Sequence, residues 1–362
     1  HREGPSLVGF ATWSALAETH GNDYRTWPEA LRHPAAPEVA AFAKEHADLV
    51  DFHMWLQWVM DEQLQHAQAK AVGAGMRLGV MHDLAVGVHP GGADAWRLQD
   101  TYAGGMEVGA PPDAYNQMGQ GWGQPPWRPD RLAEHGYAPF RDLIAAVLRH
   151  AGGVRIDHVV GLFRLWWVPS GNTPTQGTYV YYDHQAMVGV LALEAHRAGA
   201  VVVGEDLGTV EPSARHYLRE RGILGTSILW FERGGDGKPL PAEHWREYCL
   251  ASVTTHDLPP TAGYLAGDHV RLRDELGLLT RPLPEEIAAD DADRGAWLEE
   301  VRNRGLLDNE PTDEEIVRAL HEYLTLTPAR LLSVALPDAV GDRRTQNQPG
   351  TTDEYPNWRV PL

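Results

Sequence analysis

The most informative stretch of the chain alternates apolar and charged residues over positions 153–158. Val154 and Ile156 fall on one side of an extended backbone, whereas Arg155 and Asp157 fall on the other. This two-residue period is typical of a β-strand. An ionised carboxylate at the end of such a strand raises the free energy of the folded state unless it is paired with a positive charge. The segment therefore predicts either a structural Arg–Asp ion pair or a functional site at a strand end.

The rest of the chain alternates apolar runs with helical patterns. Further runs that predict strands lie at residues 76–83, 163–168, 200–206, 225–231, 250–257 and 330–336. Helical patterns lie at residues 37–73, 185–198, 266–326 and from Glu211 onward. This alternation predicts an α/β fold, either an open parallel sheet or a (β/α)8 TIM-type barrel with helical insertions.

About six strand–helix units can be recognised between Leu78 and Leu336, whereas a closed barrel needs eight. We expect the two missing strands either upstream of His1 or hidden within the first 70 residues. The helical segment 37–73 carries an apolar stripe that is predicted to be core. It comprises Val50, Phe52, Trp55, Leu56, Val59, Met60 and Leu64.

One long stretch, from Gly87 to about Pro129, is rich in Gly, Pro and Trp and has little periodicity. A loop of this length inside a compact domain is usually functional. Its aromatic residues argue against a disordered insertion, and we expect some of them to offer flat surfaces to a ligand.

Charge and composition limit the classes of partner that the protein is expected to bind. The formal net charge of −19 disfavours nucleic acid. No run approaches the roughly 18 apolar residues of a membrane span, so no membrane partner is expected. A single cysteine, Cys249, excludes an internal disulfide and fits the cytoplasm. No cofactor and no metal site are expected, because His82-Asp83 and His256-Asp257 lack the spacing of a metal motif.

Three predicted strands end in carboxylates: Asp157, Glu205 and Asp257. In a barrel these ends converge on one face, and two carboxylates facing one bond are what glycoside chemistry requires. Asp157 suits the nucleophile because Arg155 would keep it ionised. Glu205 suits the acid/base, since its neighbour Asp206 would disfavour a second negative charge. Spacing alone leaves open the ordinary alternative, because any α/β protein has carboxylates at strand ends.

Five motifs make the interpretation specific. Segments 154–158 (VRIDH), 203–208 (VGEDLG) and 255–257 (THD) resemble signature strand ends of the α-amylase clan, in the form found in the 4-α-glucanotransferases (amylomaltases, or disproportionating enzymes). Segments 109–125 and 349–359 resemble the long active-site loop and the C-terminal motif of that family. The resemblance runs from about Ser6 to Leu362.

The resemblance implies a role for each matching residue. Asp157 would be the nucleophile, Glu205 the acid/base and Asp257 the transition-state stabiliser. The implied substrate-binding residues are Arg155, His256, Asp83, Trp122, Tyr115 and Asp206, with Asn347 left open. The loop differs from the usual Trp-Gly-Asn-Pro at Gln124, which affects the acceptor site rather than the reaction.

The function implied is that of a retaining 4-α-glucanotransferase acting on α-1,4-glucan or maltooligosaccharide donors and acceptors. Residues 1–362 would form a catalytic barrel domain with inserted helical subdomains, apparently lacking its first strands. The chain would then be a C-terminal portion of a longer protein, unless a second chain supplies the remainder. Two alternatives stay open, an α-glucan hydrolase of the same clan and a non-catalytic glucan-binding fragment. A metal-dependent barrel hydrolase is disfavoured by ligand spacing.

Overall fold

The computed structural model describes residues 3–112, 118–208 and 210–362. The chain divides into two compact units. The first comprises His1–Glu205 with Val210–Ala214, and the second comprises Asp206–Thr209 with Arg215–Leu362.

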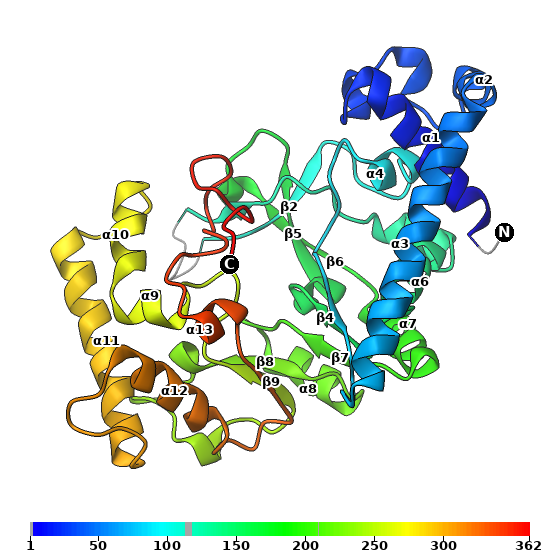
Figure 1. Ribbon diagram of the computed structural model, residues 1–362. Coiled ribbons are helices and arrows are strands. Elements are labelled where there is room, and N and C mark those ends of the chain that lie inside the picture. Colours follow the sequence, from blue (N-terminus) through cyan, green and yellow to red (C-terminus); the bar gives the residue numbers. More distant parts are fainter. Residues whose placement is uncertain (1–2, 113–117, 209) are drawn as a thin grey trace. The chain divides into compact units, whose positions relative to one another are not determined.

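The first unit is built on a parallel sheet of three strands in the order β1–β4–β7. These strands are β1 (Met81–Leu84), β4 (Gly153–Ile156) and β7 (Val201–Gly204). Figure 1 labels β4 and β7 of this sheet. Helix α6 (Ala138–Leu148) packs against β1, β4 and the neighbouring helix α7 (His184–Ala198). The predicted alternation is confirmed on β4, because Val154 and Ile156 are buried whereas Arg155 is only partly buried.

A second sheet of the first unit is antiparallel, in the order β3–β2–β5–β6. Its strands are β2 (Met106–Ala110), β3 (Gln120–Gly121), β5 (Arg164–Pro169) and β6 (Thr178–Tyr181). The apolar run at 163–168 is therefore a strand of this sheet and not of the parallel one. A Cβ atom at Gly109 would lie 2.1 Å from the carbonyl oxygen of Gln120, so the glycine permits the close approach of β2 and β3.

The long stretch from Gly87 to about Pro129 is thus partly regular. It contains helix α4 (Ala93–Arg97) as well as β2 and β3, and α5 (Pro129–Glu134) begins where it ends. The sequence showed little periodicity there because each of these elements is shorter than two helical turns or one typical strand.

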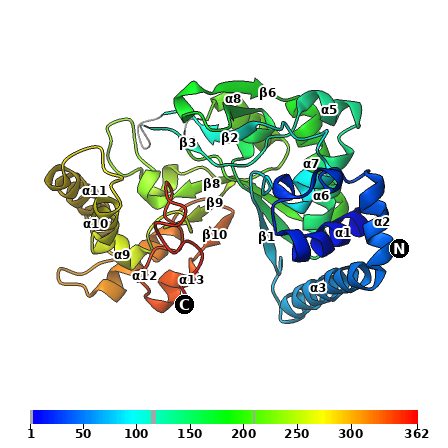
Figure 2. The ribbon, with the colours of Figure 1, turned by 90° about the horizontal axis from the view of Figure 1, so that it is seen from above.

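Three helices open the first unit: α1 (Gly4–His20), α2 (Pro37–Glu45) and α3 (Ala47–Gly73). Helix α1 lies along α3, as Figure 2 shows. Ala11, Ala15 and Val50 form the buried centre of this contact. Every regular element between residues 3 and 70 is helical, so the expectation of strands hidden in that part is wrong.

The prediction that the apolar stripe of α3 is core is also wrong. Only Val50, which faces α1, is buried; Phe52, Trp55 and Met60 are 46%, 50% and 47% exposed. At 100° per residue Phe52 and Trp55 lie on the side of α3 opposite Val50, whereas Met60 lies between the two sides. The helix is apolar on two opposite faces, and α1 covers one of them.

The second unit contains another three-stranded parallel sheet, in the order β10–β9–β8. Its strands are β8 (Gly225–Ile228), β9 (Cys249–Ser252) and β10 (Leu331–Ser333). The helices are α9 (Thr261–Leu265), α10 (Asp268–Glu275), α11 (Leu283–Asn303), α12 (Asp313–Leu324) and α13 (Leu336–Val340). Helix α8 (Pro212–Glu220) precedes β8. A core containing Trp297, Leu320 and Tyr323 holds α11 and α12 together.

The six parallel strands correspond to the six predicted strand–helix units, and the mixed α/β class is confirmed. Within the described residues these strands form two three-stranded sheets, so closure into a barrel stays a prediction. None of the helices described is both long enough and apolar enough to cross a bilayer.

Candidate active site

A cluster of charged side chains lies at the carboxyl end of strand β4. Arg155 lies opposite Asp83 of β1 in the sheet register. Its Nη1 donates to Asp83 Oδ1 at 2.7 Å, and its Nη2 lies 2.9 Å from Asp157 Oδ1. Burial alone would lower the pKa of Arg155, but the two carboxylates outweigh it and raise that pKa. The guanidinium is therefore a fixed positive charge between two acidic side chains.

Glu205 follows β7 at the position that matches Asp157 on β4. The last register pair of these neighbouring strands is Ile156 with Gly204, and Asp157 and Glu205 come one residue later. The Glu205 N–H donates to the carbonyl of Ile156 at 2.9 Å. Adjacent strands lie about 4.8 Å apart, so the register places the two carboxylates on neighbouring backbones at the same level.

His158 contacts both the Glu205 side chain and its backbone segment. Its N–H donates to Glu205 Oε2 at 3.0 Å, and the next N–H, of Val159, donates to the Glu205 carbonyl at 2.9 Å. His158 has φ 46° and ψ 56°, the left-handed region. The sequence alone did not indicate a role for His158, because the pattern of apolar and polar residues does not predict a positive φ at a histidine.

The imidazole of His158 is neutral at physiological pH, since burial lowers the pKa of His158 to about 4. Its ring meets the indole of Trp122 edge to face, with centroids 5.3 Å apart. Trp122 Nε1 donates to Gln120 Oε1 at 3.0 Å. Trp122 is thus held beside the carboxylates of the first unit, whereas Tyr115, the other predicted aromatic platform, lies outside the described residues.

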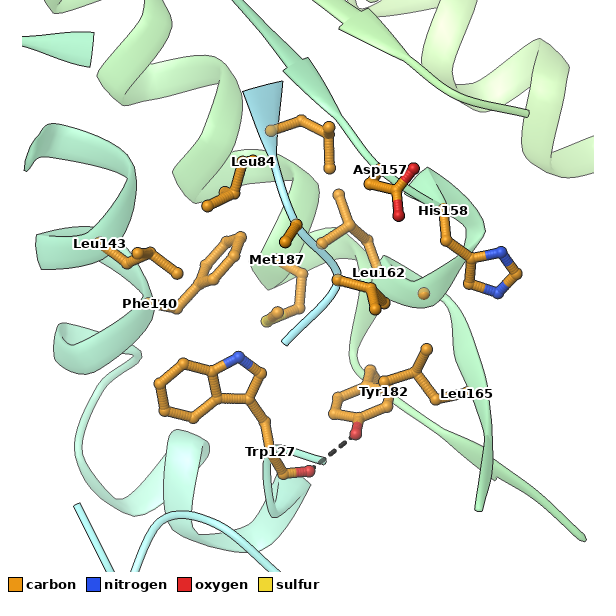
Figure 3. A pocket seen from close by; sticks show the side chains of 14 residues that line it. Leu84, Trp127, Phe140, Leu143, Asp157, His158, Leu162, Leu165, Tyr182 and Met187 are labelled. Atoms are coloured by element: carbon orange, nitrogen blue, oxygen red, sulfur yellow. Dashed lines mark hydrogen bonds between the residues drawn. The ribbon is translucent and has the colours of Figure 1, made fainter. Parts of the chain in front are cut away.

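A small apolar cavity of about 50 Å³ lies beneath the end of β4. Figure 3 shows Asp157 and His158 at its edge, with Leu162, Leu165 and Tyr182 among the side chains that line it. Tyr182 donates its hydroxyl to the carbonyl of Trp127 at 2.7 Å. The cavity is too small and too apolar for a sugar, so it belongs to the support of the site and not to the ligand surface.

The second unit carries the other predicted residues after β9. Asp257 Oδ1 accepts from Asn347 Nδ2 at 2.6 Å, and Asp257 Oδ2 lies 3.3 Å from His256 Nε2. The Asn347 N–H donates to the His256 carbonyl at 3.2 Å, and the His256 ring lies 5.1 Å from that of Trp358. Asn347, which the sequence left open, therefore orients Asp257 within this unit.

Asp206 is buried in a network of hydrogen bonds within the second unit. Its side chain is only 3% exposed, and its carboxylate accepts from Arg246 Nη1 and Nη2 at 2.5 and 2.8 Å. It also accepts from Arg215 Nε at 3.2 Å and from the Thr226 N–H at 2.9 Å. These donors satisfy the buried Asp206 carboxylate within the protein, and its predicted contact with substrate stays a prediction.

The same network corrects the electrostatic argument made for Glu205. The two guanidiniums neutralise Asp206, so its charge does not act unscreened on the neighbouring carboxyl group. A Cβ atom at Gly225 would lie 2.4 Å from Arg246 Nη1 and 2.9 Å from Asp206 Oδ2. Gly225 therefore leaves the space in which this pair forms.

The predicted residues thus fall into two groups. Asp83, Arg155, Asp157, Glu205 and Trp122 lie in the first unit, and Asp206, His256 and Asp257 lie in the second. Within the first unit, Arg155 joins Asp83 to Asp157, and His158 joins Glu205 to Trp122. The first unit therefore brings together groups of the kinds that acid–base and nucleophilic chemistry uses.

A model of the 4-alpha-glucanotransferase family matches residues 1–362. The chain belongs to this family. The 4-alpha-glucanotransferase of Mycobacterium tuberculosis (strain ATCC 25618 / H37Rv) is 70% identical over 367 residues, which cover 100% of this chain and 51% of that protein. That of Haemophilus influenzae is 34% identical, covering 94% and 50%. The chain spans about half the length of these curated relatives.

Two solved structures are similar in fold. The amylomaltase from Corynebacterium glutamicum superposes with a TM-score of 0.89 at 49% identity, over 100% of this chain and 51% of that one. An amylomaltase from Streptococcus agalactiae in complex with acarbose gives 0.80 at 18% identity, over 99% and 68%. At 18% identity the second likeness concerns the fold alone.

Proposed function

We propose that the protein is a retaining 4-α-glucanotransferase that breaks an α-1,4 bond in a maltooligosaccharide and passes the glycosyl group to the 4-OH of another glucan. The observation that carries this proposal is the matched placement of Asp157 and Glu205 on neighbouring strands. Retaining enzymes hold their two carboxyl groups about 5–5.5 Å apart, close to the spacing of adjacent strands.

In the first half-reaction Asp157 acts as the nucleophile. A carboxylate oxygen of Asp157 forms a bond to C1 of the donor sugar while the bond from C1 to the leaving 4-oxygen breaks. Glu205 gives its proton to that oxygen. Arg155 supports the ionised form of Asp157 through the 2.9 Å contact, because an opposite charge at this distance favours the carboxylate.

In the second half-reaction Glu205 acts as a base. It takes the proton of an acceptor 4-OH as that oxygen attacks C1, and the bond between Asp157 and C1 breaks. Two displacements at C1 restore the original anomeric configuration. Glu205 ends the first half-reaction ionised, with Asp157 held as a neutral ester, and it ends the second protonated, with Asp157 again a free carboxylate. The enzyme is therefore regenerated after both half-reactions.

We assign Asp257 to stabilisation of the oxocarbenium-like transition state, with His256 as a substrate ligand. This assignment is supported by the bonds from Asn347 and His256, which hold the Asp257 carboxylate in one orientation. A preorganised negative charge of this kind stabilises positive charge that develops at C1. Asp83, which is partly exposed, can accept from a sugar hydroxyl while it keeps its bond to Arg155.

Transfer in place of hydrolysis requires that an acceptor sugar displaces water from the intermediate. Trp122 and, outside the described residues, Tyr115 are proposed as platforms on which acceptor rings stack, since sugars present apolar CH faces to aromatic rings. The indole of Trp122 is supported by His158 in a fixed orientation. A hydrolase of the same clan would share the carboxylates and differ in this loop.

The architecture proposed for the whole enzyme is a (β/α)8 barrel in which further polypeptide supplies the remaining strands. Two parallel sheets of three strands and the likeness to amylomaltases support it. The exposed apolar face of α3 also supports it, because such a face is usually covered. The cytoplasm remains the proposed compartment, supported by the single buried cysteine, Cys249.

The test is incubation of the intact protein with maltotriose, with the oligosaccharide ladder and the total reducing ends followed together. A ladder that extends beyond maltotriose at constant reducing ends is expected. Rising reducing ends with only shorter products would indicate a hydrolase. Binding without turnover would indicate a non-catalytic glucan-binding protein.

A further inference from the structure

Building on the proposed function, we propose that His158 is a positioning residue whose left-handed backbone aims its N–H at Glu205 Oε2 and thereby places the catalytic proton on Oε1. The contact is the 3.0 Å hydrogen bond from His158 N to Oε2. The side chain of His158 is not required to touch the substrate.

The backbone conformation of His158 is the first argument. A φ of 46° is uncommon for a residue with a side chain, and such positions cluster at functional sites. Neighbouring bonds hold the conformation: the Val159 N–H donates to the Glu205 carbonyl, and the Gly161 N–H donates to the His158 carbonyl at 2.8 Å. The same turn therefore binds Glu205 twice, once through its backbone and once through its side chain.

The chemistry of the hydrogen bond is the second argument. A backbone N–H can only donate, so Oε2 must present a lone pair to it. The carbonyl oxygen of a protonated carboxyl group is a better acceptor than its hydroxyl oxygen, so this hydrogen bond favours placement of the Glu205 proton on Oε1. That proton passes from Oε1 to the leaving 4-oxygen as the C1–O bond breaks and the bond from Asp157 to C1 forms. Oε1 later receives the proton of the acceptor 4-OH.

The setting of the imidazole is the third argument. The half-buried ring is neutral, and it packs against the indole of Trp122. Figure 3 shows His158 next to Asp157 at the edge of the apolar cavity. A neutral, half-buried ring packed on Trp122 fixes the turn without adding a charge beside Asp157, which leaves Arg155 as the cation of the cluster.

The predicted consequence concerns the titration of Glu205. In the first unit, Arg155 interacts electrostatically with Glu205 as well as with Asp83 and Asp157, and the His158 ring is neutral. An N–H donor stabilises the ionised carboxylate. If a substitution at His158 turns this donor away, the pKa of Glu205 rises, by about one unit for the loss of one hydrogen bond to a charged group.

The experiment uses the intact protein labelled with ¹³C at the glutamate side-chain carboxyl carbon. The Glu205 signal is identified by its loss in Glu205→Gln, and its pKa is read from the ¹³C shift against pH. Two variants are compared, His158→Gly and His158→Val. Glycine tolerates a positive φ, whereas valine does not. Tyr137→Val is the matched control, because Tyr137 also has positive φ (59°) but begins α6.

We expect an upward shift of about one unit in His158→Val and no shift in His158→Gly or Tyr137→Val. If His158→Val fails to fold, His158→Ala replaces it and a smaller upward shift is expected. Equal pKa values of Glu205 in the Gly, Ala and parent proteins, or equal shifts in the Gly and Val variants, would overturn the proposal. Because the titration does not depend on turnover, absence of transferase activity would contradict the proposed function alone.

Discussion

Arg155 Nη2 lies 2.9 Å from Asp157 Oδ1, and the two residues are separated by one position on the same strand. The alternation of β4 puts both side chains on one face, and Asp157 follows directly after Ile156, the last residue of the strand. A strand that places a cation directly behind a carboxylate prepares that carboxylate to react as an anion. The predictions below follow from this arrangement and from two buried networks of the second unit.

Replacement of Asp157 by Asn should remove turnover and leave glucan binding nearly unchanged. The amide has the shape of the carboxylate but cannot form the covalent intermediate, so a loss of about 10³-fold or more in kcat is expected. Initial rates of maltotriose disproportionation and the Kd for maltotriose measure the two effects. Asp142→Asn, on the exposed face of α6, is the matched control and should retain parent activity. Appreciable residual transfer by the Asp157 variant would exclude Asp157 as the nucleophile.

Replacement of Arg155 by Lys should lower kcat/KM although the positive charge is kept. The two terminal nitrogens of the guanidinium contact Asp83 and Asp157 at the same time. A lysine has a single ammonium group and cannot reproduce this forked geometry. Loss of one charge-assisted hydrogen bond corresponds to about 10- to 100-fold in kcat/KM. Arg155→Met should cost more than Arg155→Lys. If the two variants had equal activity, charge at this position would have no role.

Replacement of Arg246 by Met should destabilise the protein through Asp206. The variant leaves a 3%-exposed carboxylate with one guanidinium in place of two. Breaking a buried ion pair lowers the free energy of unfolding by about 3 kcal/mol or more. Because Arg215 still pairs with Asp206, we expect a loss of about 3 kcal/mol. Urea denaturation measures it.

The double variant Arg246→Met with Asp206→Asn should be less destabilised than the sum of the single variants, because no charge is left buried without its partner. Arg128→Met, which breaks the exposed pair with Asp130, is the control and should have a much smaller effect. Strict additivity at positions 206 and 246 would show that the two side chains do not interact.

The stability of the protein should fall as pH rises above about 6.5 through His321. Burial alone would lower the pKa of His321, but the Asp338 carboxylate and the Val317 carbonyl raise it above the ordinary value of 6.5. Nδ1 bonds to Val317 O at 2.8 Å, and Nε2 lies 3.4 Å from Asp338 Oδ2. The folded state then holds a proton that the unfolded state has already released.

This contribution is complete below the unfolded pKa and disappears as pH passes the folded pKa. The difference in free energy of unfolding between the parent and His321→Gln should therefore shrink between pH 6 and the folded pKa, and become constant above it. Denaturation at a series of pH values gives this difference directly. A difference that grows with pH would reverse the sign of the coupling.

Local periodicity predicted the strands that carry the chemistry. Residues 154–157 alternate between apolar and charged residues, and β4 covers the first three of them; the carboxylates at 157 and 205 follow the two strands as expected. The failure on α3 has a physical cause. A helix with apolar residues on two sides does not reveal which side has a neighbour in the fold, and here α1 contacts the Val50 side.

The surroundings of Asp206 and His158 could not be predicted from the motifs, because they depend on contacts with residues outside them. Adjacent residues at a strand end point to opposite sides, so the period alone could have separated Asp206 from Glu205. The partners of Asp206, however, come from 9 and 40 positions further along the chain. The positive φ of His158 follows from the bonds that Val159 and Gly161 make, and these exist only once β4 and β7 have paired.

The central claim is that Asp157 becomes bonded to the sugar during transfer, and trapping tests it most directly. The Glu205→Gln variant lacks the base needed to release the intermediate, so incubation with α-maltosyl fluoride should accumulate a glycosylated protein. Peptide mass spectrometry after acid quench should locate one maltosyl group on Asp157. A maltosyl group on another carboxylate, or no adduct while maltose of inverted configuration is released, would contradict the account.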